Sequence, residues 1–326
     1  MATSDRLNRR TTANIDERQP RRAPARPFRL VVHRRRRVGS SRPPKPSPIR
    51  ESRTTLDGVR TRVLEVAGDG PPILLLHGFS DSADTWRPVL EALEAQSRRG
   101  IAVDLPCFGA ASRLSRGPLL TRFDRFTAAF VRQYGRDEPV ILAGNSLGGL
   151  LTLRAGQGDD LPLLAVAGIG PAGLSYTPRF EDAFVWLRRL RPALQVVRVL
   201  PVPTSVVRSG VARAYDARLA QGRADPELAW RFASHFDSMR DVHRLFPIML
   251  TLSEESRDDP LRLDQIDVPV ALLLGARDPL VPVSAGRVLL DVIPHAHVAV
   301  FEDCGHCPQV QRPDDVASLL AALPVA

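Results

Sequence analysis

The stretch Gly144-Asn145-Ser146-Leu147-Gly148-Gly149 follows the apolar run Val140–Ala143 and precedes a helix-like segment. A serine hydroxyl is a weak nucleophile unless it is presented and activated. A sharp strand-to-helix turn with glycines on both sides presents the central side chain above the edge of a sheet. We therefore predict Ser146 as a nucleophile. The N–H of Leu147, at the start of the helix, is suited to hold a developing oxyanion.

An acid and a base follow two later strand-like runs. Asp278 comes after Val268–Leu274, and His306 comes after Val298–Phe301. The carboxyl ends of parallel strands share one edge of a sheet, where the sites of open α/β proteins lie. His306 therefore falls at the same edge of the sheet as Ser146, and we predict that it is the base. Asp278 reaches the same edge, although an aspartate before proline is also common in ordinary turns.

Another loop, His77-Gly78-Phe79-Ser80, follows a buried strand-like run. Gly78 allows a close turn, so the N–H of Phe79 is predicted to face Ser146 and to complete an oxyanion hole. The alternative is an ordinary loop after a strand. For His77 itself we expect hydrogen bonds to the backbone rather than catalysis. His235 and His243, in a helical segment, are interpreted as surface or core histidines.

The three cysteines raise the question of redox or metal chemistry. Cys304 and Cys307 have the C-x-x-C spacing of redox proteins. That chemistry needs a thioredoxin-like unit, and Pro308 with Gln309 follows instead of one. Zinc needs more ligands, and only the distant Cys107 remains. We expect no metal, no organic cofactor and no disulfide framework.

Strand-like and helix-like patterns alternate from about residue 54. An Asp57-Gly58 turn predicts a hairpin. Buried strands are predicted by the apolar runs Pro72–Leu76, Ile101–Leu105, Val140–Ala143, Leu161–Ala167, Val268–Leu274 and Val298–Phe301. Helical patterns between them include Trp86–Ala95 and Arg122–Tyr134. The alternation indicates an α/β fold, with a mostly parallel central sheet and helices on both faces.

The alternation stops over residues 174–262, where the pattern is helical. This segment holds nine of the 18 aromatic residues. We predict an α-helical cap inserted into a core made of residues 54–173 and 263–326. Phe184, Trp186 and Trp230 are expected to line its apolar substrate pocket. The alternative is that these rings only form the cap's own small core.

Residues 1–53 differ in composition from the rest of the chain. They contain 15 arginines, the single lysine and seven prolines against four acidic residues, so they account for more than the whole net charge of +9. Little apolar surface is available there for burial, so we expect a disordered arm. It is interpreted as a solvated tail, as the product of a translation start placed too early, or as an arm with weak affinity for polyanions or membrane surfaces.

No apolar run approaches the roughly 20 residues of a membrane-spanning helix. The short run at Phe28–Val32 includes an arginine and does not resemble a secretory signal. We expect a cytoplasmic protein with no transmembrane segment and no nucleic-acid partner.

Together these motifs resemble the α/β-hydrolase superfamily, in the family's order Ser…Asp…His. The motifs are His77-Gly78-Phe79, the elbow around Ser146, Gly275-Ala276-Arg277-Asp278-Pro279 and Gly305-His306-Cys307-Pro308. The resemblance covers residues 54–326. It implies a triad of Ser146, His306 and Asp278, with Phe79 and Leu147 amides as the oxyanion hole. The loop after Asp104 departs from the family, which usually has glycine at position 107.

Within this superfamily, dehalogenases and epoxide hydrolases use an aspartate nucleophile, which Ser146 argues against. Carbon–carbon bond hydrolases usually carry a tryptophan after the histidine, where Cys307 stands here. We therefore favour a carboxylic ester hydrolase, whose expected substrate is a small-molecule, ester-like compound with an apolar or aromatic acyl group. A carbon–carbon hydrolase, thioesterase, acyltransferase or cofactor-free perhydrolase would use the same residues. A non-catalytic binding protein of this fold is the alternative from another class.

Overall fold

The structure is a computed structural model. It describes residues 31–33, 48–114, 117–158, 160–178, 203–214 and 238–323, with positions 181, 182, 185, 189, 233, 235 and 236. No helix within these ranges is long and apolar enough to cross a bilayer. The pocket residues predicted in the cap, Phe184, Trp186 and Trp230, lie outside the described residues.

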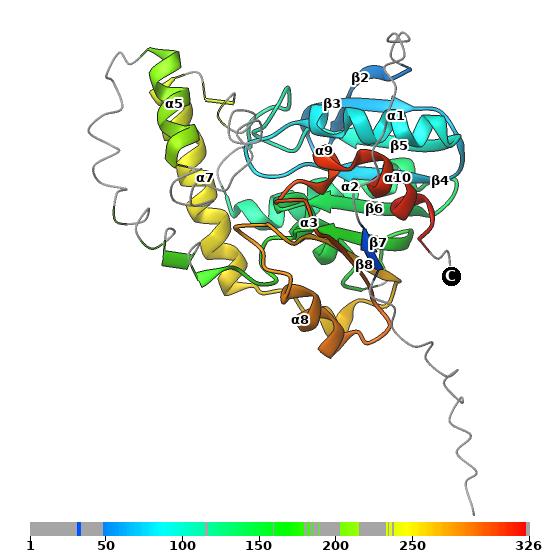
Figure 1. The fold of residues 1–326 in the computed structure, drawn as a ribbon. Helices are drawn as coiled ribbons and strands as arrows, with labels where there is room; N and C mark the ends of the chain where they lie inside the picture. The colour runs from blue at the N-terminus through cyan, green and yellow to red at the C-terminus, as the bar shows by residue number, and fades with distance from the viewer. Residues whose placement is uncertain are drawn as a thin grey trace, which may run out of the picture.

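A nine-stranded sheet forms the centre of the protein, in the order β1-β9-β8-β7-β6-β4-β5-β3-β2 (Figure 1). Its strands are β1 (Val31–His33), β2 (Arg50–Leu56), β3 (Val59–Val66), β4 (Asp69–Leu76), β5 (Arg98–Val103), β6 (Val140–Asn145), β7 (Leu163–Ile169), β8 (Val270–Gly275) and β9 (His297–Phe301). The β2–β3 and β3–β5 pairs are antiparallel, and all the other pairs are parallel. The predicted fold class is therefore confirmed.

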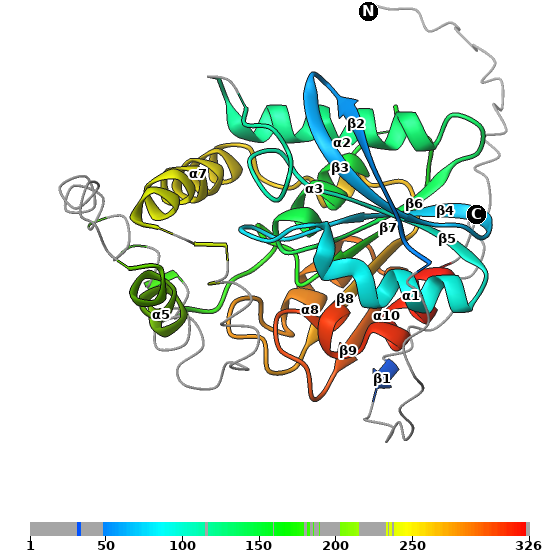
Figure 2. The ribbon, with the colours of Figure 1, turned by 90° about the horizontal axis from the view of Figure 1, so that it is seen from above.

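Helices cover both faces of this sheet, as Figure 2 shows. The helices of the described residues are η1 (Ala83–Trp86), α1 (Arg87–Ala95), α2 (Leu119–Tyr134), α3 (Leu147–Ala155), α5 (Thr204–Ala214), α7 (Met239–Asp258), η4 (Leu263–Gln265), α8 (Ala285–Val292), α9 (Pro308–Gln311) and α10 (Pro313–Ala321). Alternate residues of β4 point to opposite faces. Leu74 and Leu76 belong to the apolar cluster that includes α2, α3 and α8, whereas Ile73 and Leu75 belong to the cluster that includes α1 and α10. Because both faces are covered, the central strands are apolar throughout.

The predicted hairpin is present, and both of its turn residues have positive φ: 45° at Asp57 and 77° at Gly58. The globular part begins before the predicted residue 54, because β2 starts at Arg50, opposite Glu65 of β3. The Arg50 guanidinium lies 2.6 Å from the Glu65 carboxylate. Residues 50–53 are exposed on an edge strand, so they lack the apolar alternation that identifies strands in a sequence. The short β1, which also lies within the predicted arm, pairs with β9.

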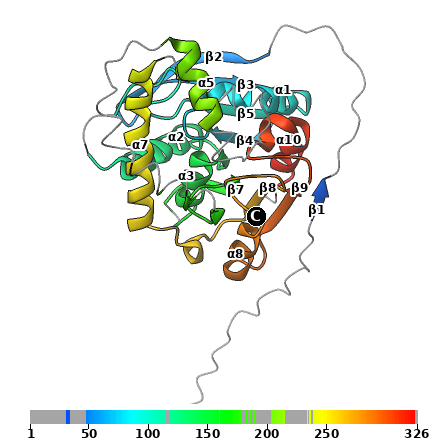
Figure 3. The same ribbon diagram turned by 60° about the vertical axis from the view of Figure 1, so that its left-hand side comes forward.

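Between β7 and β8, the described residues include two helices, α5 and α7, which lie off one end of the sheet (Figures 1 and 3). The guanidinium of Arg244, on α7, donates a 2.8 Å hydrogen bond to the carbonyl of Cys107, in the loop after β5. Val207 of α5 and Leu245 of α7 are buried in the same apolar cluster as α2 and α3. These two helices therefore pack on the core next to the carboxyl ends of the strands.

Candidate active site

Ser146 is the single residue that joins β6 to α3. Its backbone has φ 53° and ψ −111°, which side-chain-bearing residues rarely adopt. Strained backbone of this kind persists where the surrounding structure imposes it, often at functional sites. The following helix starts at Leu147, and the first N–H groups of a helix have no partner within it. The structure thus has the strand–turn–helix context in which a serine is presented beside free amides.

Two glycines let the helix approach the sheet closely enough to form this turn. A Cβ on Gly148 would collide with the carbonyl oxygen of Leu76 in β4, and a Cβ on Gly144 would collide with the carbonyl of Gly148. Neither position tolerates a side chain without moving backbone atoms. The G-x-S-x-G spacing is therefore explained by the packing of α3 against β4 and β6.

Asp278 and His306 meet at the carboxyl ends of β8 and β9. The Nδ1 atom of His306 lies 2.7 Å from Oδ2 of Asp278. The other oxygen of Asp278, Oδ1, accepts hydrogen bonds from the amides of Leu280 and Val281, at 2.8 and 3.1 Å. Both side chains are almost completely buried, with relative exposures of 8% for His306 and 1% for Asp278. The carboxylate is thus fixed on both oxygens, and one of them faces the imidazole.

The remaining imidazole nitrogen, Nε2 of His306, is buried and has no hydrogen-bond partner in the part of the chain that the structure describes. An unpaired buried nitrogen is costly unless a group absent from the structure completes it or its chemistry requires it free. With Nδ1–H directed at Asp278, Nε2 carries the lone pair that accepts a proton.

The side chain of Asn145 connects the serine turn to the histidine loop and to β7. Nδ2 of Asn145 donates to the carbonyl of His306 at 2.9 Å and to that of Ile169 at 3.0 Å. Gly170, with φ 48°, lies so close to the pair that a Cβ there would be 3.1 Å from the Asp278 carboxylate and 3.2 Å from Nδ1 of His306. Neither Asn145 nor Gly170 was predicted to have a role in the site. The one signal in the sequence is Asn145 itself, a polar residue at the end of an otherwise apolar strand.

The loop after β4 lies against the same serine. A Cβ on Gly78 would be 3.3 Å from Cβ of Ser146 and 3.1 Å from Oδ1 of Asn145. His77 is completely buried, and Nε2 of its ring accepts the amide of Leu105 at 2.8 Å. Its Nδ1 lies 2.7 Å from the carbonyl of Gly78. Burial lowers the pKa of His77, so the ring stays neutral and holds the backbone, as predicted.

The departure at position 107 has a clear structural outcome. Cys107 has φ 72°, a left-handed conformation that favours glycine. Its sulfur is 3.4 Å from the amide of Leu114, which donates to it. The loop therefore keeps the backbone shape that a glycine would adopt, at the cost of placing a Cβ there.

The C-x-x-C pair does not have the environment of a redox site. None of the three cysteines forms a disulfide, and Cys304 is buried. Burial, with the nearby Asp303 carboxylate, raises the pKa of the Cys304 thiol to about 12. Reactive cysteines of this spacing have lowered pKa values instead. The described residues also contain no cluster of three or more His, Cys, Asp or Glu side chains able to hold a metal.

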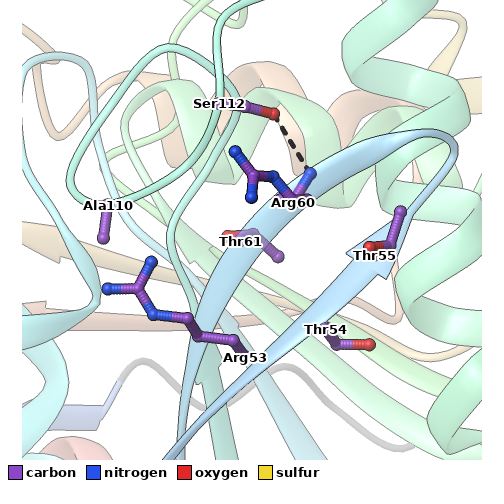
Figure 4. Close-up of a pocket in the computed structure, with 7 residues that line it drawn as sticks. All are labelled: Arg53, Thr54, Thr55, Arg60, Thr61, Ala110 and Ser112. Atoms are coloured by element: carbon purple, nitrogen blue, oxygen red, sulfur yellow. Dashed lines mark hydrogen bonds between the residues drawn. The ribbon is translucent and has the colours of Figure 1, made fainter.

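A separate polar hollow of about 230 Å³ lies at the β2–β3 hairpin, where two arginines extend beside the loop that carries Ala110 (Figure 4). It is lined by Arg53, Thr54, Thr55, Arg60, Thr61, Ala110 and Ser112. None of these residues belongs to the serine turn or to the Asp278–His306 pair.

Comparison with known proteins agrees with this fold. Residues 73–319 match the Alpha/beta hydrolase family. The chain belongs to this family. Among curated relatives of this alpha/beta hydrolase is the 2-hydroxy-6-oxo-6-(2'-aminophenyl)hexa-2,4-dienoic acid hydrolase of Metapseudomonas resinovorans. It is 26% identical over 267 residues, which are 80% of this chain and 86% of the relative.

Two further relatives have different named activities. The monoacylglycerol lipase ABHD6 of Bos taurus is 28% identical over 277 residues, 78% of this chain and 75% of the relative. The dihydrolipoyllysine-residue acetyltransferase component of the acetoin cleaving system from Cupriavidus necator is 25% identical over 268 residues, 81% of this chain. The hydrolase chain spans only 66% of the length of that relative.

Among solved structures, a bacterial membrane phospholipase A is similar to this alpha/beta hydrolase, with a TM-score of 0.63 and 25% identity. The match covers 85% of this chain and 86% of the other. The family and these relatives support hydrolase activity, and they differ too much among themselves to define a substrate.

Proposed function

We propose that the protein is a serine hydrolase that cleaves carboxylic esters through Ser146, His306 and Asp278. The observation that carries this proposal is the 2.7 Å contact between Nδ1 of His306 and Asp278, beside a buried Nε2 that has no hydrogen-bond partner among the described residues. Such an arrangement sets the tautomer in which Nε2 accepts the proton of a serine. Ser146 stands at the same edge of the sheet, on a backbone that presents its hydroxyl.

In the proposed reaction, Oγ of Ser146 attacks the ester carbonyl carbon while its proton passes to Nε2 of His306. The negative charge moves to the carbonyl oxygen, which accepts hydrogen bonds from the amides of Phe79 and Leu147. Collapse of this intermediate breaks the carbon–oxygen bond, and His306 returns the proton to the leaving alcohol. Water then hydrolyses the acyl-enzyme by the same steps, and Asp278 stabilises the imidazolium each time.

Residue 307 favours an ester over a carbon–carbon substrate. Cys307 directly follows the histidine, and its sulfur lies 3.9 Å from Oδ1 of Asn145, behind the serine turn. The tryptophan that carbon–carbon hydrolases usually carry at this point would be far larger. Thioesters, acyl transfer and perhydrolysis remain chemically open to the same three residues, because each begins with an acyl-enzyme.

We further propose that residues 174–262 form a cap over this site and that Phe184, Trp186 and Trp230 contact the acyl group. The packing of α5 and α7 on the core next to the strand ends supports this placement. An apolar lining on a cap selects substrates by shape, so the cap rather than the triad would set the acyl preference.

A fluorophosphonate probe, followed by mapping of the modified peptide, tests the nucleophile directly. The probe should label Ser146, and Ser146→Ala should lose both labelling and at least about 10³-fold of p-nitrophenyl ester turnover while keeping the wild-type circular dichroism spectrum. Ser284→Ala, at an exposed serine, should behave as wild type. Retained turnover in Ser146→Ala, or no labelling of wild type, would contradict the proposal and favour a non-catalytic protein.

A further inference from the structure

The loop from Gly78 to Ser82 contains a buried carboxylate that the proposed reaction does not use. Asp81 stands two residues after Phe79, and its side chain is only 16% exposed. Its Oδ1 accepts the amide of Ser82 at 2.8 Å. Among the described residues no arginine pairs with it. A buried carboxylate is costly without a positive or hydrogen-bonding partner, so its surroundings must compensate.

That compensation comes from outside the core. Nε2 of His235, in the segment before α7, lies 3.6 Å from Oδ1 of Asp81. Burial would raise the pKa of Asp81, but its surroundings, His235 first among them, hold it below its usual value. The ring of His77 is already committed to the Leu105 amide through Nε2 and to the carbonyl of Gly78 through Nδ1. His235 is therefore the side chain left to stabilise the Asp81 carboxylate.

His235 is held in place on both sides along the chain. Ala233 is completely buried, and Phe236 is only 6% exposed and belongs to the apolar cluster of the core. Two residues later, Ser238 and Asp241 form a capping box at the start of α7. A histidine between such anchors cannot move away from Asp81 without exposing apolar surface.

The residue directly before Asp81 has a strained backbone. Ser80 has φ 53°, and its buried hydroxyl has no hydrogen-bond partner in the described part of the chain. Phe79 packs edge-to-face on Phe108 at 5.2 Å between ring centroids. A strained segment needs surrounding contacts to stay in place. The Asp81–His235 contact supplies one directly after the strained residue.

We propose that His235 is a positioning residue that, by pairing with Asp81, fixes the loop carrying the Phe79 amide and so couples the segment before α7 to the oxyanion hole. This inference rests on the proposed function, because it assigns Phe79 to the oxyanion. At 3.6 Å, Nε2 of His235 lies just beyond hydrogen-bond distance of the carboxylate, so the contact is a polar one between a side-chain N–H donor and Asp81. Its effect falls on the transition state, where the oxyanion develops, and not on substrate binding.

The test compares His235→Ala, Asp81→Asn and the double variant, using a short p-nitrophenyl ester. Loss of a whole oxyanion-hole donor costs 10²–10³ in kcat, so a loosened one should cost about tenfold. We expect kcat and kcat/KM to fall by the same factor in each single variant, with KM unchanged. The double variant should lose no more than either single variant, because the two residues act through one contact.

His235→Gln keeps a side-chain donor and should retain activity within about threefold of wild type. His295→Ala, at an exposed histidine before β9, is the matched control and should be fully active. If His235→Ala does not fold, Asp81→Asn and His235→Gln carry the test. The inference is overturned if His235→Ala is as active as wild type or if only KM rises. It is also overturned if the loss of kcat in the double variant equals the product of the losses in the two single variants. Fluorophosphonate labelling of Ser146 in the wild-type protein is measured separately. If the probe did not label Ser146, the proposed function would be refuted, whereas the variants of His235 and Asp81 test the contact between these two residues.

Discussion

At the scale of single residues, the two oxygens of Asp278 have different tasks. Oδ1 is held by two backbone amides of its own loop, and Oδ2 is left to face Nδ1 of His306. The carboxylate therefore cannot rotate away, and the imidazole is held with Nε2 directed away from Asp278. The orientation of His306 therefore depends on one atom, Oδ2 of Asp278, which a single substitution can replace.

We predict that Asp278→Asn lowers kcat for an ester substrate by about 10³–10⁴, as in the serine protease triad. The amide keeps the size and the Oδ1 contacts, but its NH₂ group facing Nδ1 favours the tautomer that carries the proton on Nε2. Steady-state kinetics at pH 7 to 8, with urea denaturation as the control for folding, measures the effect. A loss of less than tenfold would mean that another acid orients His306.

At the scale of elements, the sequence was most informative where strands are buried on both faces. The apolar runs before the serine, the acid and the histidine correspond to β6, β8 and β9, within two residues at each end. Their order fixes which loops share an edge, so the positions of Ser146, Asp278 and His306 followed from pattern alone. The contacts made by Asn145 and Gly170 did not, because they join loops far apart in the chain.

The edge strand β2 and the helices between β7 and β8 were harder to predict from the sequence, for physical reasons. β2 is stabilised by cross-strand ion pairs such as Arg50–Glu65, and these leave no hydrophobic period in the sequence. The helices α5 and α7 lie in a stretch that was predicted to be helical, but their packing on the core joins segments far apart in the chain. The role of His235 became visible only through its contact with Asp81, since neither residue lies in a recognisable motif.

The loop after β5 gives a prediction at this scale. Cys107 holds a left-handed backbone, which costs about 1–2 kcal/mol for a residue with a Cβ. Cys107→Gly removes that cost but also loses a buried side chain and makes the unfolded chain more flexible. We expect the free energy of unfolding to change by no more than about 1 kcal/mol, because these effects oppose each other.

Cys107→Val is the matched comparison, since a β-branched side chain is the least tolerated at positive φ. It should destabilise the protein by at least about 2 kcal/mol in urea denaturation. Equal stability of the glycine and valine variants would show that the loop relaxes and that φ at residue 107 does not matter.

At the scale of the whole molecule, one arginine joins three separate parts of the chain. Arg62 of β3 contacts Asp104, after β5, at 2.9 Å and Asp84, in η1, at 2.6 Å. The buried Asp104 carboxylate also accepts the amides of Ala83 and Ala110, at 2.7 and 2.8 Å. This network fixes the antiparallel edge of the sheet to the loops that surround the candidate site.

The network predicts a specific response to acid. Burial opposes ionisation of Asp84, but Arg62 and Arg87 outweigh it and lower its pKa from 3.8 to about 2. A carboxyl group whose pKa is lower in the folded state adds stability above its unfolded pKa, and this stability is lost as pH falls through the folded value. The contribution of Asp84 should therefore be complete above about pH 4 and disappear toward pH 2.

Asp84→Asn should accordingly be less stable than wild type at pH 6 and lose less stability between pH 4 and pH 2. The Asp84 side chain is 44% exposed, so the difference at pH 6 should not exceed about 1 kcal/mol. Urea denaturation at several pH values measures it, and Glu91→Gln, at an exposed position of α1, reports the effect of net charge alone. If Asp84→Asn and wild type lost stability in parallel below pH 4, the Arg62 network would not be what holds this edge of the sheet against acid.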